Sequence, residues 1–583
     1  MYTRVLACDF DGTGAAGGRL APEVCDALIA ARAAGVATLL VTGRVLEDLR
    51  LGNVDFGAFD AVVAENGAMV WLPESDRIIQ LGGAPSPDFL GRLRAAGVPF
   101  HVGAVVVGTW EGHAAQALQL IRDEGADLQL VFNRAAVMLL PTGVNKAVGV
   151  RRALGELGRS AHNMVAFGDA ENDLPLFALA EVGVAARGAV PAVARIADDH
   201  LSQPGTSGVA HYVRRLAASG WELPTPARHA LALGRATDGA PARLPVGGNV
   251  LVSGDPRSGK SWLSGLVAER LVEAGYGICV IDPEGEYDTL GERPGVLVLG
   301  RNLPLPAPEA VPALLRRTGC GVVLTLSALS ADERCAWACA VLAALAAERR
   351  RSGLPHWIVV DEAQYFFHDG APSCAGLVSE TGNLVLVTYR PSLLAEAVHA
   401  SVTAHVVTRT VVDEERYFVD GLLRSHGPPG LVPPDALARL CMPRAGLLVQ
   451  TPGGPRWQVF EPGQRASPHV HHRRKYADGE LPPEKGFAFR LPPDGVICVA
   501  RNVREFCDAV RRVPLASLQH HLAAGDFSRW AEAVLGEPLL AAGLAKLEHA
   551  AAAGAAASRD EIVAHVEDRY VISPRSFGEA VSA

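Results

Sequence analysis

The stretch from Val250 to Leu263, VLVSGDPRSGKSWL, places a short apolar strand before a glycine-rich loop and the start of a helix. The loop has the pattern G-x-x-x-x-G-K-S, in which Gly254 and Gly259 can take backbone angles that other residues avoid. Consecutive N–H groups of such a loop hold phosphate oxygens, and the following helix adds the positive end of its dipole. Lys260 is expected to reach the β- and γ-phosphates and Ser261 to hold Mg²⁺. The stretch therefore predicts a site for a nucleoside triphosphate such as ATP.

The composition narrows the class of protein. A chain of 583 residues predicts about three to four domains, and its net charge of −9 argues against coating nucleic acid by bulk electrostatics. No signal peptide pattern is visible, and no apolar stretch reaches the roughly 18 residues that cross a bilayer. The ten cysteines include no C-x-x-C pair, and we interpret Cys335 and Cys339 as core packing in a helical segment. We expect a soluble, cytoplasmic protein with reduced cysteines and no membrane partner.

Charged and polar side chains follow the predicted strands of the first third. The strand in RVLACDFDGT ends in two carboxylates two residues apart, which alternation places on the same side. Two carboxylates at a strand end suit one Mg²⁺ and an in-line phosphoryl transfer. Strands alternate with helical segments, which predicts an α/β fold with a parallel sheet and its chemistry at the carboxyl ends. The candidate site residues in this third are Asp9, Asp11, Thr42, Lys146, Asp169 and Asp173.

In this order, the segments RVLACDFDGT, ATLLVTGR, TGVNKAVGV and MVAFGDAENDLPLF resemble those of the haloacid-dehalogenase-like phosphatases with an inserted cap. The resemblance covers residues 1–215. It implies a Rossmann-like core and an α+β cap at about 73–142 that sets the choice of substrate. It also implies a small phosphorylated sugar or acid as substrate, because the family includes phosphoglycolate and sucrose-phosphate phosphatases.

The same resemblance assigns roles to the candidate residues. Asp9 would be the nucleophile that becomes an aspartyl-phosphate, and Asp11 the general acid and base that also offers its carbonyl group to Mg²⁺. Thr42 would bind the transferring phosphoryl group, and Lys146 would neutralise that group and orient Asp9. The remaining metal ligands and the residue that braces their loop would be Asp169, Asp173 and Asn172.

The middle third continues the strand pattern after a Pro-, Gly- and Ala-rich stretch at 216–248, which we interpret as a linker, part of which forms a small β lead-in to the glycine-rich loop. In WIVVDEAQ, Asp361 fits the Mg²⁺ shell through water, and Glu362 would polarise the attacking water. Thr388, at the end of the strand in NLVLVTYRPS, is placed to sense the γ-phosphate. Arg409 is interpreted either as an arginine finger or as a solvated arginine at a strand end.

The elements DPEGEY, DEAQ and TYRPS resemble those of HerA/FtsK-type motor ATPases of the RecA-like class, over residues 225–460. The resemblance implies ATP hydrolysis and a hexameric ring, and many members move DNA. Tyr389 stands where many HerA-like proteins have Gln, and the phosphatase-like region takes the place of their small barrel, so DNA translocation does not follow. The acidic residues of DPEGEY either cap a turn or lie near the nucleotide: Asp282, Glu284 and Glu286.

Residues 465–583 predict a small, mostly helical accessory domain without a catalytic constellation. Near its start lies a basic cluster that either grips a phosphate or nucleic-acid backbone or is a solvated loop. Its members are His469, His471, His472, Arg473, Arg474 and Lys475.

Three hypotheses for the whole chain follow. The first is a bifunctional enzyme, in which a Mg²⁺-dependent phosphatase of small metabolites is fused to a HerA-like ATPase. The second is an oligomeric ATPase or DNA translocase in which the phosphatase-like domain recognises or regulates. The third is a nucleic-acid end-processing phosphatase-kinase, which the DEAQ element and the sensor strand fit less well, because kinase chemistry needs a lid and an acceptor base.

Overall fold

The computed structural model describes two compact units, residues 1–279, 307–322 and 335–464, and residues 280–306, 323–334 and 465–583. Among the described residues, no helix is both long and apolar enough to cross a membrane. The described residues are all of 1–583 except 17, 53, 257, 319–320, 371, 426–431, 434, 442–444, 451–455, 468–480, 482–484, 492–494, 536–537, 553–558 and 571–583.

The N-terminal part of the first unit is built on an eight-stranded sheet, the first sheet, in the order β14-β13-β12-β1-β4-β5-β6-β7. The strands from β14 to β5 run parallel, whereas β6 and β7 are antiparallel additions at one edge. The strands are β1 (Val5–Asp9), β4 (Ala37–Val41), β5 (Ala61–Ala64), β6 (Met69–Leu72), β7 (Arg77–Gln80), β12 (Met164–Gly168), β13 (Val182–Ala185) and β14 (Asp199–His200).

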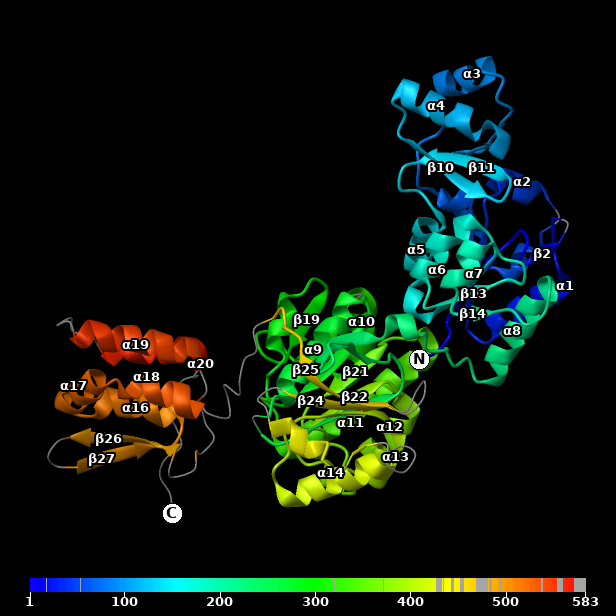
Figure 1. The fold of residues 1–583 in the computed structure, drawn as a ribbon. Helices are drawn as coiled ribbons and strands as arrows, with labels where there is room; N and C mark the ends of the chain where they lie inside the picture. The colour runs from blue at the N-terminus through cyan, green and yellow to red at the C-terminus, as the bar shows by residue number, and fades with distance from the viewer. Residues whose placement is uncertain are drawn as a thin grey trace. The chain divides into compact units, whose positions relative to one another are not determined.

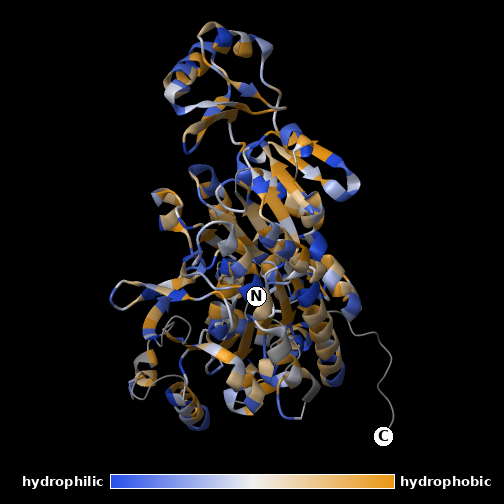
Figure 2. Cartoon of the chain, turned by 90° about the vertical axis from the view of Figure 1, so that its right-hand side faces the viewer, coloured by the Kyte–Doolittle hydropathy of each residue, from blue (hydrophilic) through white to orange (hydrophobic). Residues whose placement is uncertain are grey.

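Helices cover both faces of the first sheet (Figure 1). Leu6 and Cys8 of β1 face one hydrophobic core, which residues of α1 and α8 complete. Val5 and Ala7 face the opposite core, completed by residues of α5, α6 and α7. Strands buried on both faces are continuously apolar, as their colouring in Figure 2 shows. The helices are α1 (Pro22–Ala33), α2 (Leu46–Leu51), α5 (Lys146–Leu157), α6 (Leu174–Leu179), α7 (Pro191–Ile196) and α8 (Thr206–Ala218).

An inserted α+β subdomain, the cap, lies between β7 and α5. Its sheet has the order β10-β11-β9-β8, and two helices pack on one face of it through residues such as Phe89 and Ile121 (Figure 1). Because β7 still pairs with β6 in the first sheet, the cap begins later than the expected residue 73. Its elements are α3 (Pro87–Ala95), β8 (His101–Val102), β9 (Val107–Trp110), α4 (Ala114–Glu124), β10 (Leu128–Asn133) and β11 (Ala136–Pro141).

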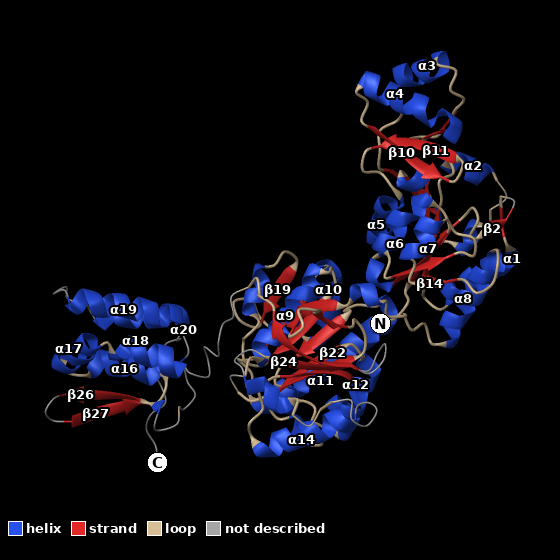
Figure 3. Cartoon of the chain, viewed as in Figure 1, coloured by secondary structure: helices blue, strands red, loops and turns tan. Residues whose placement is uncertain are grey.

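A second sheet occupies the rest of the first unit, where its strands follow the order β16-β15-β25-β24-β23-β17-β22-β21. β17 pairs in parallel with both β22 and β23, and helices lie on both sides of these strands (Figure 3). The strands are β15 (Leu231–Ala236), β16 (Pro241–Leu244), β17 (Asn249–Ser253), β21 (Trp357–Val360), β22 (Leu384–Thr388), β23 (Val402–Val407), β24 (Gly446–Gln450) and β25 (Arg456–Pro462). β15 and β16 fall within the stretch expected to be a linker or lead-in, and they extend the antiparallel edge of the sheet.

Helices α9 (Lys260–Glu273), α10 (Val311–Thr318), α13 (Glu396–Ser401) and α14 (Asp413–Ser425) accompany the second sheet. The two sheets meet at a buried polar junction. The Tyr276 hydroxyl donates to Glu181, which is fully buried, over 2.9 Å, and the His162 ring stacks on the Tyr276 ring at 3.9 Å. Burial and the neighbouring carboxylate raise the pKa of Tyr276.

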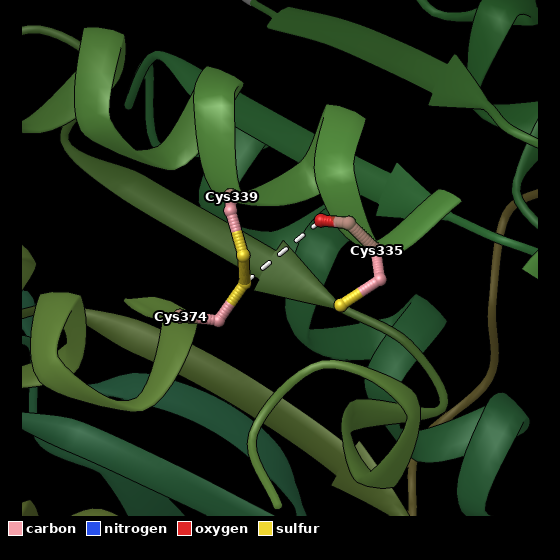
Figure 4. Close-up of a disulfide and its surroundings, with 3 residues drawn as sticks. All are labelled: Cys335, Cys339 and Cys374. Carbon is pink, nitrogen blue, oxygen red and sulfur yellow. Dashed lines mark hydrogen bonds between the residues drawn. A yellow bond between two sulfur atoms is a disulfide. The ribbon is translucent and has the colours of Figure 1, made fainter. Parts of the chain in front are cut away.

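The expectation of reduced cysteines is wrong for one pair. Cys339 of α11 (Ala331–Ser352) is joined by a disulfide to Cys374 of α12 (Pro372–Thr381), with their Cα atoms 5.1 Å apart (Figure 4). The two residues are 35 positions apart in the sequence, so only the folded arrangement of the two helices brings them together.

The C-terminal part of the second unit combines a β-hairpin with helices around an aromatic core that includes Phe487, Phe506 and Trp530 (Figure 1). The hairpin is an addition to the expected, mostly helical domain, and the basic cluster at 469–475 lies outside the described residues. Its elements are β26 (Phe487–Leu491), β27 (Gly495–Ala500), α16 (Val503–Arg512), α17 (Leu515–Ala524), α18 (Asp526–Trp530), α19 (Pro538–Ala552) and α20 (Arg559–Tyr570).

Candidate active sites

The carboxyl ends of β1 and β12 bring together three buried carboxylates, Asp9, Asp169 and Asp173, which we call the carboxylate cluster. One oxygen of each lies within 4.8 Å of the others. Lys146, the first residue of α5, is 1% exposed and donates from Nζ to Asp9 Oδ1 and to Asp173 Oδ1, both over 2.6 Å. Four of the residues expected from the sequence therefore meet at one point.

Burial and neighbouring charges shift the pKa values of this cluster in opposite directions. Burial raises the pKa of Asp9, against the lowering effect of the Lys146 ammonium, and burial also raises the pKa of Asp169. Burial alone would lower the pKa of Lys146, but Asp173 and Asp9 outweigh it and raise that pKa. Three carboxylates around one ammonium leave an excess of negative charge in a place that excludes water.

Thr42 lies directly after β4, fully inside the protein, and its hydroxyl oxygen accepts the N–H of Arg44 over 3.2 Å. The Asp11 side chain does not join the carboxylate cluster. It is about half exposed and accepts two hydrogen bonds from the Arg44 guanidinium, over 2.8 and 2.7 Å. Arg44 also lies over the ring of Phe10. The sequence showed Arg44 at the strand end but gave no indication of this pairing.

Arg134 is a site residue that the sequence did not indicate. It occupies the turn between β10 and β11 of the cap with φ of 53°, and its Nε donates to Asp169 Oδ2 over 3.1 Å. Its N–H donates to Glu171 over 3.0 Å. The hydrogen bond to Asp169 raises the pKa of the Arg134 guanidinium. The cap thus places a cation on the carboxylate cluster.

A second contact ties the cap to the core. The buried Glu65 carboxylate, in the loop after β5, accepts the N–H groups of Ala104, Val105 and Val106 over 3.0, 2.8 and 3.0 Å. Nearby, Asn172 donates to the Asn66 side chain over 3.1 Å, which links the loop of the carboxylate cluster to the loop after β5. No pattern in the sequence predicted that Glu65 would hold three consecutive amides.

The first sheet is doubly wound, a lysine lies among buried aspartates at its carboxyl edge, and a cap is inserted in the chain. Together these features define a class of hydrolases with a Rossmann-like core. The model of the haloacid dehalogenase-like hydrolase family matches residues 109–213. The phosphoglycolate phosphatase of Methanothermobacter thermautotrophicus is 30% identical over 228 residues, which are 37% of this chain and 100% of that protein. The phosphoglycolate phosphatase of Halorubrum lacusprofundi is 31% identical over 219 residues, 35% of this chain and 94% of that protein.

A solved haloacid dehalogenase-like hydrolase from Bacteroides thetaiotaomicron is 18% identical to this chain, with a TM-score of 0.33. The superposition covers 36% of this chain and 99% of that hydrolase. The chain belongs to the haloacid dehalogenase-like hydrolase family. The resemblance that the sequence motifs indicated for the N-terminal third is confirmed.

The glycine-rich loop lies between β17 and α9. Gly254 and Gly259 have φ of 151° and 102°, and a Cβ atom on Gly254 would lie 2.0 Å from the Thr408 hydroxyl oxygen. Lys260, the first residue of α9, donates from Nζ to the Asp255 carbonyl oxygen over 2.9 Å, and Ser261 follows it. The loop has the backbone geometry that its pattern requires.

Neighbouring strand ends carry the other residues expected at this loop. Ser253 pairs with Thr388, and Val360 pairs with Leu386, so β17, β22 and β21 end at the same edge. Asp361 follows β21 and is 3% exposed. The next residue, Glu362, has φ of 47°.

Gln364 connects two of these residues. Its Nε2 donates to Glu362 Oε2 over 2.5 Å, and its Oε1 accepts from the Thr388 hydroxyl over 2.6 Å. The motif DEAQ predicted no role for Gln364, although its position two residues after Glu362 was the available signal. Arg409 is exposed, and in the described part of the chain its side chain makes no hydrogen bond or ion pair.

In the second unit, Asp282 accepts the N–H groups of Glu284, Gly285 and Tyr287 over 3.1, 2.7 and 2.9 Å. Burial raises the pKa of Asp282 to about 7. This side chain therefore caps the turn, one of the two interpretations of DPEGEY. Glu284 lies 4.0 Å from Arg334.

Proposed function

We propose that residues 1–215 hydrolyse a small phosphate monoester through an aspartyl-phosphate on Asp9. The observation that carries the proposal is the buried Lys146 ammonium, which holds an oxygen of Asp9 at 2.6 Å. In the first step an Asp9 oxygen attacks phosphorus, and Asp11, after turning away from Arg44, gives a proton to the departing oxygen. In the second step Asp11 takes a proton from the attacking water, the acyl phosphate breaks, and Asp9 and inorganic phosphate are released.

Mg²⁺ fits the carboxylate cluster, because three buried carboxylates carry more charge than Lys146 neutralises, and hard cations prefer oxygen ligands. Asp9, Asp169 and Asp173 would hold it, and the resemblance adds the Asp11 carbonyl group. When bound, the ion would neutralise charge on the phosphoryl oxygens. Arg134, which now contacts Asp169, would then be available to the substrate.

The substrate class that this site supports is a small phosphorylated acid of the phosphoglycolate type, with a sugar phosphate as the second candidate. Two relatives covered over nearly their whole length are phosphoglycolate phosphatases. Arg134 adds a guanidinium at the carboxylate cluster, and a guanidinium can bind a carboxylate in a bidentate manner.

For residues 225–460 we propose ATP hydrolysis. The support is the geometry of the glycine-rich loop and the hydrogen bonds from Glu362 through Gln364 to Thr388, which would position the attacking water beside the γ-phosphate. Lys260 would bind the phosphates, and Ser261 and Asp361 would hold the Mg²⁺ of the nucleotide. An exposed Arg409 suits a ring of subunits, in which it would reach a neighbour's nucleotide.

The experiment measures phosphate release from 2-phosphoglycolate, hexose phosphates and ATP, with Mg²⁺, for the wild type, Asp9→Asn and Lys260→Ala. We expect Asp9→Asn to lower turnover of the monoesters on the order of 10³-fold or more and to spare ATP hydrolysis. Lys260→Ala should do the reverse. Loss of both activities in either folded variant would contradict two separate sites.

The alternative is an ATPase or DNA translocase whose phosphatase-like domain only recognises or regulates. It predicts phosphate release from ATP alone, increased by DNA and lost in Lys260→Ala. Sedimentation of the protein with and without ATP tests the hexamer. A nucleic-acid end-processing enzyme would instead release phosphate from DNA ends, and that release would be lost in Asp9→Asn.

A further inference from the structure

Three cysteines of the first unit meet between two helices, and neither proposed reaction uses them. Cys335 and Cys339 lie four residues apart on α11, which places them on one face of that helix, and Cys374 lies on α12. Their sulfur atoms all lie within 4.8 Å of one another, and we call them the three-cysteine cluster. Cys339 and Cys374 form the disulfide, and Cys335 is a free thiol (Figure 4).

The third sulfur is the unusual feature of this cluster. A disulfide needs two cysteines, and the Cα separation of 5.1 Å between Cys339 and Cys374 falls in the ordinary range for one. The Cys374 sulfur also lies 4.0 Å from the Cys335 carbonyl oxygen, which is a packing contact because a disulfide sulfur carries no hydrogen. Thiol–disulfide exchange requires a further thiol beside a disulfide, and Cys335 is in that position.

Burial distinguishes Cys374 from the other two cysteines. Cys374 is fully buried, whereas Cys335 and Cys339 are half-buried. A small molecule in solution can therefore reach Cys335 but not Cys374, and Cys335 is the cysteine of the cluster that stays a free thiol when the disulfide is formed. Among the described residues, no other free thiol is grouped with a disulfide: Cys279 and Cys507 are buried, and burial raises the pKa of each to about 12, while Cys25 and Cys498 are partly exposed but lie outside the cluster.

We propose that the three-cysteine cluster is a thiol–disulfide exchange site for small thiols and small disulfides, with Cys335 as the thiol of entry. In the direction of oxidation, the Cys335 thiolate attacks a small disulfide, forms a mixed disulfide and releases one small thiolate. The Cys374 thiolate then attacks the Cys335 sulfur and expels the second small thiolate. Finally the Cys339 thiolate attacks the Cys374 sulfur, which leaves the Cys339–Cys374 disulfide and returns Cys335 as a thiolate.

The three exchange steps balance in electrons, protons and sulfur atoms. Two protein thiols lose two electrons and release two protons, and one small disulfide gains both and becomes two small thiols. Cys335 is regenerated, so it relays the disulfide to the buried sulfur of Cys374. In the direction of reduction, the same steps run backwards with a small thiol as reductant.

The position of the disulfide gives the exchange a consequence within the second sheet. α12 leads directly into β22, the strand that ends at Thr388, and Thr388 donates to Gln364. Oxidation therefore fixes the helix between Gln364 and Thr388 to α11. The exchange site itself goes beyond the proposed hydrolytic functions and does not depend on either of them.

The test uses the full chain, reduced with dithiothreitol, freed of reductant without oxygen and then mixed with oxidised glutathione. Samples are quenched with an alkylating reagent, and peptide mass spectrometry follows each cysteine with time. In the wild type we expect glutathione to appear first on Cys335 and then to disappear as the Cys339–Cys374 disulfide forms. Cys335→Ser should slow formation of that disulfide about tenfold or more, because the thiol of entry is lost.

Three further variants keep the result interpretable. Cys374→Ser should leave glutathione on Cys335, because no buried thiolate remains to expel it. Cys498→Ser, which removes a half-buried free thiol outside the cluster, should leave the wild-type rate unchanged. Cys335→Ala repeats the measurement with a different side chain in case the serine variant is unstable.

Three outcomes would overturn the proposal. If Cys335→Ser and Cys335→Ala form the disulfide at the wild-type rate, Cys335 is not the thiol of entry. If the wild type forms no Cys339–Cys374 disulfide with oxidised glutathione, there is no exchange site. If the reduced wild type binds one Zn²⁺ that blocks alkylation of all three cysteines, and Cys335→Ser does not bind it, the cluster is a metal site instead.

Discussion

Replacing Lys146 with methionine tests the central contact of the carboxylate cluster. Methionine has nearly the same length and fills the same space, but it leaves Asp9 and Asp173 buried without the ammonium that both contact at 2.6 Å. Removing one partner of a buried ion pair costs about 3–5 kcal/mol, because an uncompensated charge remains inside. For a domain of this size, that loss lowers the unfolding midpoint by roughly 6–20 °C.

The assay is calorimetry in the presence of a chelator, so that no divalent ion replaces the ammonium. The matched control is Arg77→Ala, because Arg77 is 54% exposed and pairs with Glu156 on the surface of the same domain. Surface pairs contribute about 0–1 kcal/mol. We also expect Asp9→Asn to recover part of the loss in the Lys146→Met background, since one of the unpaired charges is then absent.

The deficit of Lys146→Met should shrink as the pH falls from 8 to 5. Burial already raises the pKa of Asp9 in the wild type, and without the ammonium that pKa rises further, so the carboxyl group becomes neutral at a higher pH. A midpoint for Lys146→Met no lower than that of Arg77→Ala would refute the reasoning. Such a result would mean that the ammonium is not held between the two carboxylates.

Three further predictions address other sites. Burial raises the pKa of Asp282 from 3.8 to about 7, so the folded state favours the neutral carboxyl group. The free energy of unfolding of the wild type, relative to that of Asp282→Asn, should therefore fall by roughly 4 kcal/mol as the pH rises from 4 to 7. Denaturant unfolding measures this difference, and a difference that does not change with pH would contradict the prediction. Gln364→Leu should lower kcat for ATP about 10²-fold with little change in KM, as steady-state phosphate release would show, and a change in KM alone would refute the role given to Gln364. Arg134→Gln should raise KM for 2-phosphoglycolate about tenfold or more and change KM for a hexose phosphate less, because a charged hydrogen bond to the carboxylate is lost; equal effects on both substrates would count against it.

The meeting of Asp9, Asp169 and Asp173 could be predicted because the carboxyl ends of the parallel strands β1 and β12 share one edge of a sheet, whereas Lys146, which follows the cap, was indicated only by the family resemblance. That rule needs only the order of strands and the residues that follow them. It also placed Thr388 beside the glycine-rich loop, at the end of the strand that pairs with β17.

Other features could not be predicted, for identifiable physical reasons. Arg134 reaches Asp169 only because the cap folds its hairpin turn over the core, and a turn arginine has no distinguishing pattern. The Cys339–Cys374 disulfide depends on the packing of two helices distant in sequence. In the stretch at 216–248, where a small β lead-in was expected, proline and glycine obscured the bounds of β15, although the alternation of buried Leu231 and Leu233 was a signal for that strand.

Two of the contacts between cap and core, at Glu65 and at Arg134, differ in how easily they can be broken. Glu65 is 1% exposed and holds three amides, so its separation would leave a carboxylate and three N–H groups without partners in a place that water does not reach. Arg134 is 52% exposed, so water can solvate its guanidinium when it leaves Asp169, and the buried Asp169 carboxylate is the one group left without that partner. The cap should therefore stay attached to the core at Glu65 and rotate about that contact. The contact at Arg134 is the one that opens to admit substrate and release phosphate.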